Sequence, residues 1–207
     1  MLKTGVTLYY VRHGETDWNR AQRYQGHRDI PINATGRAQA TGNGRLLAAA
    51  LGDRAAHLDY VASPLKRASE TMQILRAQLG LDSRAYRTDD RLMEINYGSW
   101  EGEPWDEMAV RDAQAYAARQ ADVWNWQPPG GESYRMLAER VAGWLAEVAD
   151  DTVVVAHGGV SRALRAVLFG LSAAEAMRLE VPQDRILVFE AGAMRWLRAQ
   201  GATAAGA

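Results

Sequence analysis

The sequence predicts an α/β fold, because short apolar strands alternate with helical patterns along its 207 residues. Residues 6–11 and 152–156 are runs of β-branched, aromatic and small apolar residues, a composition typical of buried strands. Between them, apolar residues recur at helical spacing. The length suits a single domain, 1–207, that buries a sizeable core and carries an inserted lid.

Two helices are expected in the first half of the chain. Residues 35–51 predict one, although Gly42 and Gly44 inside it each cost about 1 kcal/mol relative to alanine. Ser63 followed by Pro64 predicts the start of the next helix, with the serine as N-cap and the proline in the first helical position. Its inward face has apolar residues at spacings of three and four: Leu65, Ala68, Met72, Leu75 and Leu79.

The remaining elements follow the same alternation. Short strands are expected at 60–62, 185–189 and 193–197, the last two as a hairpin. A helix that begins at Ser133 is predicted to bury four apolar side chains: Leu137, Val141, Trp144 and Val148. A further helix follows the strand at 152–156 and runs to about residue 169.

Residues 100–131 differ in character and predict an inserted helical lid. They contain four tryptophans, many charges and a Pro-Pro-Gly-Gly run. Tryptophans at such positions usually pack within the core or lid, and an apolar substrate pocket is the alternative hypothesis. The small, weakly polar residues 199–207 are expected to form a frayed tail.

The composition excludes several function classes. The formal net charge of −1 gives no overall attraction for nucleic acid or an anionic membrane, so neither is expected as a partner. The absence of cysteine excludes disulfides, thiolate metal sites and cysteine nucleophiles, and it fits a reducing cytoplasm. No segment resembles a signal peptide or a membrane span. The expected location is therefore cytoplasmic.

Two histidines follow predicted strands directly. His13 comes after the strand at 6–11 and His157 after the strand at 152–156, each with a glycine beside it that permits close backbone approach. In open α/β sheets the ligand crevice lies outside the carboxyl ends of the strands. If these two strands are neighbours, the imidazoles face each other across that crevice.

The residue types favour phosphoryl chemistry over metal binding. The chain has no His-Glu-x-x-His motif and no carboxylate at ligand spacing, whereas a neutral histidine is a competent nucleophile toward phosphorus. Arg12 lies beside His13, and Arg67 lies in the first turn of a predicted helix, where both could hold a phosphate. Glu94 is flanked by apolar residues, a setting that favours a protonated carboxyl able to serve a leaving group.

Five motifs occur in order between about residues 6 and 170. They are LYYVRHGET at 8–16, a loop set (WN at 18–19, QG at 25–26, DIP at 29–31, TG at 35–36), ASPLKRA at 62–68, LMEINYGSWEG at 92–102, and GGES at 130–133 with VAHGG at 155–159. This set resembles the histidine phosphatase superfamily, in its phosphoglycerate-mutase-like branch. Because chance must satisfy all the motifs at once, the resemblance is specific.

The resemblance implies a three-layer α/β/α sandwich with a mostly parallel central sheet, and a reaction that needs no metal and no cofactor. It implies that His13 attacks phosphorus and that Glu94 protonates the leaving oxygen, then activates the water that hydrolyses phosphohistidine. The phosphoryl oxygens are expected to contact Arg12, Arg67 and His157. Further phosphate or substrate contacts are expected from Asn19, Gln25, Gly26, Tyr97 and Gly158.

The same site serves phosphatases and mutases. A phosphatase is favoured because the chain is short for a cofactor-dependent mutase, its acid segment reads EINYG at 94–98 instead of ERHYG, and the lid lacks a paired-arginine run. Arg111 and Arg119 are nevertheless present in the lid, and Tyr97 and the hydroxyl of Thr16 fit a mutase.

A third hypothesis is an inactive module that binds a phosphorylated partner. It ranks below the enzyme, because binding alone does not require two histidines and an acid. The expected partner is a small phosphorylated metabolite, and the resemblance adds a homodimer as a candidate assembly. His27, His57 and Arg28 are interpreted as solvated loop residues without a catalytic role.

Overall fold

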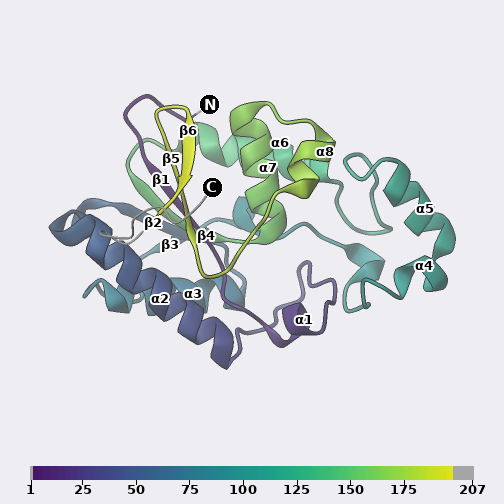
Figure 1. Cartoon of the computed structure of the whole chain (residues 1–207), viewed down its shortest axis with the longest axis horizontal. Helices are drawn as coiled ribbons and strands as arrows, with labels where there is room; N and C mark the ends of the chain where they lie inside the picture. Colours follow the sequence, from purple (N-terminus) through teal and green to yellow (C-terminus); the bar gives the residue numbers. More distant parts are fainter. Residues whose placement is uncertain (1, 198–207) are drawn as a thin grey trace, which may run out of the picture.

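The fold has three layers, with a central sheet between two pairs of long helices (Figure 1). The computed structural model describes residues 2–197, and the expected tail at 199–207 lies outside them. Helices α2 (Ala34–Leu51) and α3 (Lys66–Gln78) cover one face of the sheet. Helices α6 (Tyr134–Glu147) and α7 (Gly158–Phe169) cover the other. The α/β/α sandwich implied by the sequence is therefore confirmed.

The sheet has six strands in the order β3-β2-β4-β1-β5-β6. The strands are β1 (Leu8–Arg12), β2 (Asp59–Ala62), β3 (Arg87–Thr88), β4 (Thr152–Ala156), β5 (Ile186–Glu190) and β6 (Ala193–Trp196). The first four are parallel, and the antiparallel β5–β6 pair is the expected hairpin. Strand β3 is not predicted from the sequence, because its two exposed residues are too few to form an apolar pattern.

Alternate residues of the central strands enter different cores. In β1, Leu8 and Tyr10 pack with α6 and α7, whereas Tyr9 and Val11 pack with α2 and α3. The neighbouring strand β4 is buried at all five positions. Because both faces of these strands are covered, their sequences read as continuous apolar runs instead of an apolar–polar alternation.

Helix α2 is continuous through Gly42 and Gly44, as predicted. A Cβ atom on Gly44 would lie 2.7 Å from Cβ of Gln78, the last residue of α3. The glycine therefore allows α2 and α3 to pack closely at this point, which offsets its poor helix propensity.

Helix α3 begins two residues later than predicted. Its first residue is Lys66, and its N-cap Leu65 offers no side-chain hydrogen bond. The backbone N–H of Lys66 instead donates to Asp29 Oδ1 at 2.6 Å, from a loop distant in sequence. The prediction that Ser63 caps this helix is wrong, because its hydroxyl is used elsewhere. At α6, by contrast, Ser133 is the N-cap as predicted.

The lid segment, residues 100–131, is a helical excursion beyond one end of the sandwich (Figure 1). It contains α4 (Met108–Arg111) and α5 (Ala113–Ala121). The buried ring of Trp100 packs on Trp126 with centroids 4.5 Å apart. The other short elements are α1 (Asp17–Arg20), α8 (Ala173–Arg178) and three 3-10 turns at Gly52–His57, Asp90–Leu92 and Gly98–Trp100. Within 2–197, no helix has the length and apolarity to cross a bilayer.

The core assignment predicts different effects for two adjacent leucines of α2. Leu47 is fully buried against the sheet, whereas Leu46 is partly exposed. Leu47→Ala is expected to lower the free energy of unfolding by about 2–5 kcal/mol, since it removes buried methyl groups and leaves a cavity. Leu46→Ala should have a clearly smaller effect. Urea denaturation at neutral pH measures both, and equal losses would contradict the burial of Leu47 against the sheet.

Candidate active site

The two predicted histidines meet at one edge of the sheet. Strands β1 and β4 are adjacent and parallel, so their carboxyl ends lie together. The backbone N–H of His13 donates to the carbonyl of Ala156 at 2.9 Å, which extends the strand pairing up to the site. The ring centroids of His13 and His157 are 5.1 Å apart. The expected juxtaposition of the two imidazoles is therefore present.

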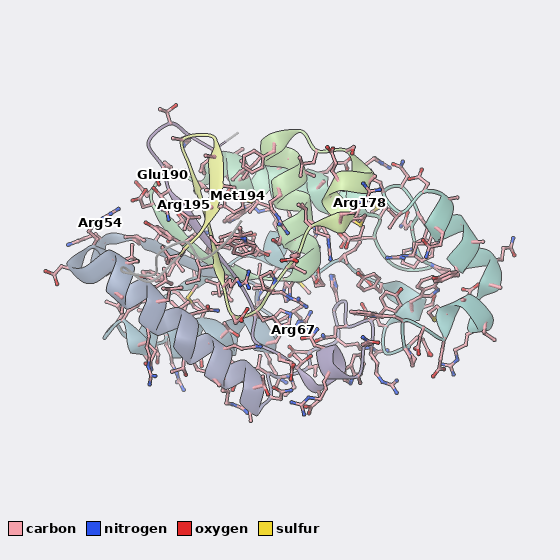
Figure 2. All side chains as sticks on the ribbon, viewed as in Figure 1. Arg54, Arg67, Arg178, Glu190, Met194 and Arg195 are labelled. Carbon is pink, nitrogen blue, oxygen red and sulfur yellow. The ribbon has the colours of Figure 1, made fainter. Side chains whose placement is uncertain are left out.

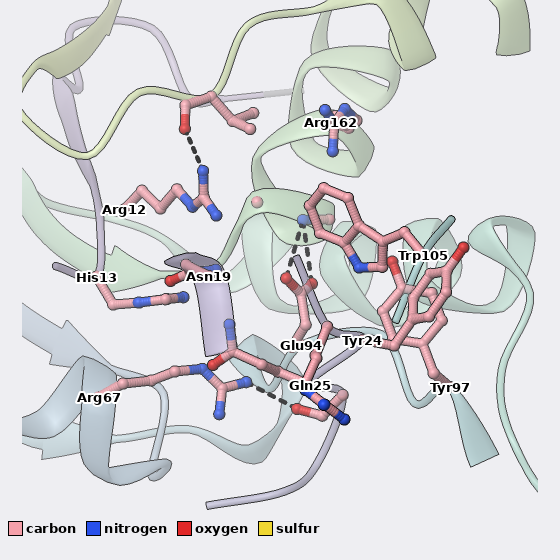
Figure 3. Close-up of a pocket in the computed structure, with 15 residues that line it drawn as sticks. Arg12, His13, Asn19, Tyr24, Gln25, Arg67, Glu94, Tyr97, Trp105 and Arg162 are labelled. Carbon is pink, nitrogen blue, oxygen red and sulfur yellow. Dashed lines mark hydrogen bonds between the residues drawn. The ribbon is translucent and has the colours of Figure 1, made fainter. Parts of the chain in front are cut away.

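A cavity of about 120 Å³ opens beside His13 (Figure 3). In this view the His13 ring lies between the side chains of Arg12 and Arg67 and points toward Glu94. Every predicted site residue except His157 lines the cavity. Residues from β1, α3, the 94–97 segment and the start of α7 therefore converge on one small polar space.

The His13 ring is held in a defined tautomer. Its Nδ1 lies 2.8 Å from the carbonyl oxygen of Gly14, which can only accept, so Nδ1 carries the proton. Burial lowers the pKa of His13 well below 6.5, and the charges of Arg67 and Arg12 lower it further. At neutral pH the ring is therefore neutral, with an unprotonated Nε2.

Arg12 supplies one buried cation. Its Nη1 donates to the carbonyl of Val181 at 2.6 Å, while its Nε is buried without a partner among the described residues. Burial lowers its pKa, and the nearby charge of Arg162 contributes in the same direction. An anion in the cavity would therefore lie against a guanidinium whose hydrogen-bond donors are only partly used within the described residues.

Arg67 supplies the second cation and is fully buried. Figure 2 shows it near the centre of the view, whereas Arg54 lies at the left end of the molecule. Its Nη1 and Nη2 donate to the carbonyls of Arg28 and Gly26, each at 2.7 Å. Burial lowers its pKa to about 10, so it stays charged at neutral pH. Each terminal nitrogen retains one N–H for a ligand.

His157 lies behind Arg67 and does not line the cavity. The Nε of Arg67 is 3.2 Å from His157 Nδ1, which must accept this hydrogen bond. Burial lowers the pKa of His157 well below 6.5, so the neutral ring carries its proton on Nε2. That Nε2 lies 2.8 Å from Ser63 Oγ, to which it donates. The hydroxyl expected to cap α3 therefore fixes the orientation of this histidine.

Glu94 lies at the N-terminus of α7. Its carboxylate accepts hydrogen bonds from the backbone N–H of Gly159, at 3.0 and 3.2 Å, and from that of Ile95. A Cβ on Gly159 would lie 2.4 Å from Glu94 Oε1, so only glycine allows this contact. The side chain of the adjacent Ile95 packs in the α6–α7 core.

The main chain at Glu94 is held by a second layer of residues. Arg140 donates to the carbonyls of Glu94 and Arg91 and forms an ion pair with Glu132 at 2.8 Å. The Nε2 of His27 also lies 2.9 Å from the Glu94 carbonyl. The interpretation of His27 as a solvated loop residue is therefore wrong. A single histidine in a polar loop carries no sequence signal of a tertiary partner.

Two amide side chains line the cavity beside His13. The Oδ1 of Asn19 accepts from Thr16 and Gln183, and the Oε1 of Gln25 accepts from Thr16 Oγ1. Their oxygens are thus occupied, which leaves their NH₂ groups for a ligand. Gln183 also donates to the His13 carbonyl at 3.1 Å, so a loop far along the chain braces the nucleophile segment.

The other predicted binding residues contribute in different ways. Gly26 offers its carbonyl to Arg67, and Gly158 opens helix α7 at the cavity wall. Tyr97 packs on Tyr24 with ring centroids 4.7 Å apart, and burial raises its pKa well above 10. The phenol is therefore neutral and able to donate a hydrogen bond.

A sequence profile described as Histidine phosphatase superfamily (branch 1) matches residues 8–200. The chain belongs to the histidine phosphatase superfamily.

Several members of this superfamily, which are named for different activities, are similar to this chain. The uncharacterized phosphatase PhoE of Bacillus subtilis is 36% identical over 172 residues, which cover 81% of this chain and 78% of that protein. A 2,3-bisphosphoglycerate-dependent phosphoglycerate mutase of Azorhizobium caulinodans is 31% identical over 198 residues, covering 90% and 92%. The solved structure of a mycobacterial glucosyl-3-phosphoglycerate phosphatase with VO3 matches with a TM-score of 0.74 and 32% identity, covering 96% of this chain and 100% of that one.

The structure adds residues that the sequence analysis missed. Ser63 belongs to the ASPLKRA motif, but its position before a proline suggested a cap. Gln183 carried no signal, because it is 170 positions from His13. Arg23, Trp105 and Arg162 also line the cavity, although nothing in their local sequence marks them.

The lid tryptophans have different environments. Trp124 stacks on Tyr134, and Trp100 is buried, which fits the packing interpretation. Trp105 is 44% exposed and borders the cavity.

Two other residues lie outside the site. His57 and Arg28 are exposed, which fits their interpretation as loop residues. Across residues 2–197, no group of three or more histidine, cysteine, aspartate or glutamate side chains is arranged to hold a metal ion.

The two buried neutral histidines predict a pH dependence of stability. Their folded-state pKa values are lowered, so below about pH 6.5 the unfolded chain binds protons that the folded chain does not. Stability is therefore complete above that pH and is lost as the pH falls, by about 1.4 kcal/mol per pH unit for each histidine. His13→Gln should reduce this slope between pH 6.5 and 5.0, measured by urea denaturation. The control is His57→Gln, which removes an exposed ring, and a slope unchanged in His13→Gln would refute the assignment.

Proposed function

We propose that this protein hydrolyses small phosphate monoesters without a metal ion, through a phosphohistidine intermediate on His13. The observation that carries the proposal is the unprotonated Nε2 of a neutral, buried imidazole that lies between two buried guanidinium groups. Phosphoryl transfer is catalysed mainly by positioning and by charge stabilisation, and this arrangement provides both.

In the first step, His13 Nε2 attacks phosphorus while the bond from phosphorus to the ester oxygen breaks. The free N–H groups of Arg12 and Arg67 hold the non-bridging oxygens, on which negative charge is spread in the transition state. The NH₂ groups of Asn19 and Gln25 and the start of helix α7 at Gly158 add further donors.

Glu94 donates its proton to the ester oxygen as the bond to phosphorus breaks, so the alcohol departs neutral and Glu94 becomes a carboxylate. The Gly159 N–H then stabilises the carboxylate. In the second step, Glu94 takes a proton from water, whose oxygen attacks phosphorus as the bond to His13 Nε2 breaks. Inorganic phosphate leaves, and both residues return to their starting states.

His157 acts in this mechanism as a positioning residue for Arg67. Its hydrogen bond with Arg67 Nε directs the guanidinium toward the cavity, and Ser63 fixes its tautomer. Direct contact between His157 and a phosphoryl oxygen stays a prediction.

The cytoplasmic location and the homodimer also stay predictions.

The primary test is turnover of 4-nitrophenyl phosphate in the presence of EDTA. Activity is expected for the wild-type chain, since no step uses a metal ion. His13→Ala should abolish it, and His57→Ala should retain it. Acid-labile, base-stable incorporation of phosphate into wild type but not into His13→Ala identifies the intermediate. Absence of turnover with tight phosphate binding would identify a binding module and overturn the proposal.

The mutase alternative is separated by a second assay. A mutase interconverts 3- and 2-phosphoglycerate after priming with 2,3-bisphosphoglycerate, whereas a phosphatase releases inorganic phosphate. Interconversion faster than phosphate release would replace the proposed function with the mutase.

The contact between Glu94 and Gly159 predicts a difference between adjacent glycines. Gly159→Ala would place Cβ 2.4 Å from Glu94 Oε1 and displace the carboxyl group, whereas a Cβ on Gly158 meets its nearest atom at 3.5 Å. Gly159→Ala is therefore expected to lower kcat by about 10²–10⁴-fold, the usual contribution of a general acid or base. Gly158→Ala should have a much smaller effect on kcat. Equal decreases in kcat for the two variants would show that the position of the Glu94 carboxyl group does not limit kcat.

A further inference from the structure

A second cavity, of about 450 Å³, adjoins the phosphate cavity. Tyr24, Tyr97, Trp105 and Arg162 line both. In Figure 3 these four side chains lie beyond Glu94 as seen from His13. A leaving group attached to a phosphate at His13 would extend past Glu94 toward this second cavity. Its walls therefore lie where the alcohol part of a substrate would be recognised.

The walls of the second cavity are aromatic and cationic. The wall contains the rings of Trp105 and of four tyrosines, Tyr24, Tyr97, Tyr116 and Tyr134. Aromatic faces of this kind pack against apolar or ring-shaped groups, and their hydroxyls provide hydrogen-bond donors. Arg119 and Arg162 add two positive charges to the same space. No aspartate or glutamate belongs to the wall among the described residues.

Arg162 is one of the two cations in this wall and lines both cavities. It lies one helical turn beyond Gly158 in α7, so both residues face the phosphate cavity. Its Nε is buried and has no hydrogen-bond partner within residues 2–197, and it forms no ion pair there. Buried polar atoms are normally hydrogen-bonded, so this unpartnered Nε in a cavity wall points to an acceptor on a bound ligand.

The lid arginines have different roles in the structure. Arg111 is exposed and forms ion pairs with Glu103 and Glu107. Arg119, on the neighbouring helix α5, has no ion-pair partner in the described part of the chain, and its charge acts on the phenols of Tyr24 and Tyr97. Of these two lid arginines, Arg119 therefore faces the cavity, and Arg111 provides a matched control.

We infer that the second cavity binds the leaving group of the substrate, and that this group combines a ring or apolar body with a negative charge held by Arg162 and Arg119. The inference rests on the proposed phosphatase activity, which it narrows to monoesters of an anionic alcohol or phenol. A planar guanidinium can bind a carboxylate or a second phosphate through two parallel hydrogen bonds. The aromatic walls hold the body of the leaving group between this contact and the phosphorus.

The test compares two phosphate esters of the same size, 4-carboxyphenyl phosphate and 4-carbamoylphenyl phosphate. The readout is the ratio of their kcat/KM values, which cancels general effects of a substitution on folding or phosphate binding. For the wild-type chain the ratio should favour the carboxylate about 10-fold or more, as expected for a charge-assisted hydrogen bond. Replacing the carboxylate by a phosphonate distinguishes the two kinds of anion.

The variants assign the effect to residues. Arg162→Gln should reduce the carboxylate preference to near unity, Arg162→Lys should retain part of it, and Arg119→Gln should reduce it. Arg111→Gln should leave the ratio as in wild type. A wild-type ratio near unity, or a ratio unaffected by Arg162→Gln, would overturn the inference while the phosphatase activity stands. No turnover of either ester, or of 4-nitrophenyl phosphate, would instead overturn the proposed function.

Discussion

The site depends on the burial of one guanidinium group. Arg67 projects from α3 and binds the ring of His157 from the β4–α7 junction and two carbonyls of the 26–28 loop. A fully buried cation is costly unless its hydrogen bonds are satisfied, and here two segments distant from α3 must be in place to satisfy them. The packing that buries Arg67 therefore also positions the side chains that would bind phosphate.

This cation also determines the chemistry of the histidines. Two imidazoles lie close together beside two arginines, so protonation of either ring is opposed both by burial and by neighbouring charge. The rings are kept neutral, and their hydrogen bonds to Gly14, Ser63 and Arg67 select one tautomer for each. The positive charge that a phosphate ester requires is thus supplied by arginine alone, which leaves histidine free to act as a nucleophile.

Much of this arrangement could be predicted from local sequence. The buried strands, the helix capped by Ser133 and the final hairpin follow from periodicity and capping, and the histidines were placed by the strands before them. The neighbours of each site residue could not be predicted in this way. The sequence around Ser63 suggests a cap because its tertiary partner is 94 residues distant, and nothing near Glu94 in sequence indicates its contact with the Gly159 N–H. Local patterns specify elements, whereas hydrogen-bond partners depend on packing.

The position of β1 in the sheet has a consequence for how the protein is made. The strand that carries the nucleophile is the first to leave the ribosome, yet it lies in the interior of the sheet between β4 and β5. Its partners are separated from it by more than 140 residues of chain, so its edges stay unpaired until β4 and β5 have been synthesised. During translation the β2–α3 region can form locally, but the nascent nucleophile strand remains exposed to chaperones and to other nascent chains.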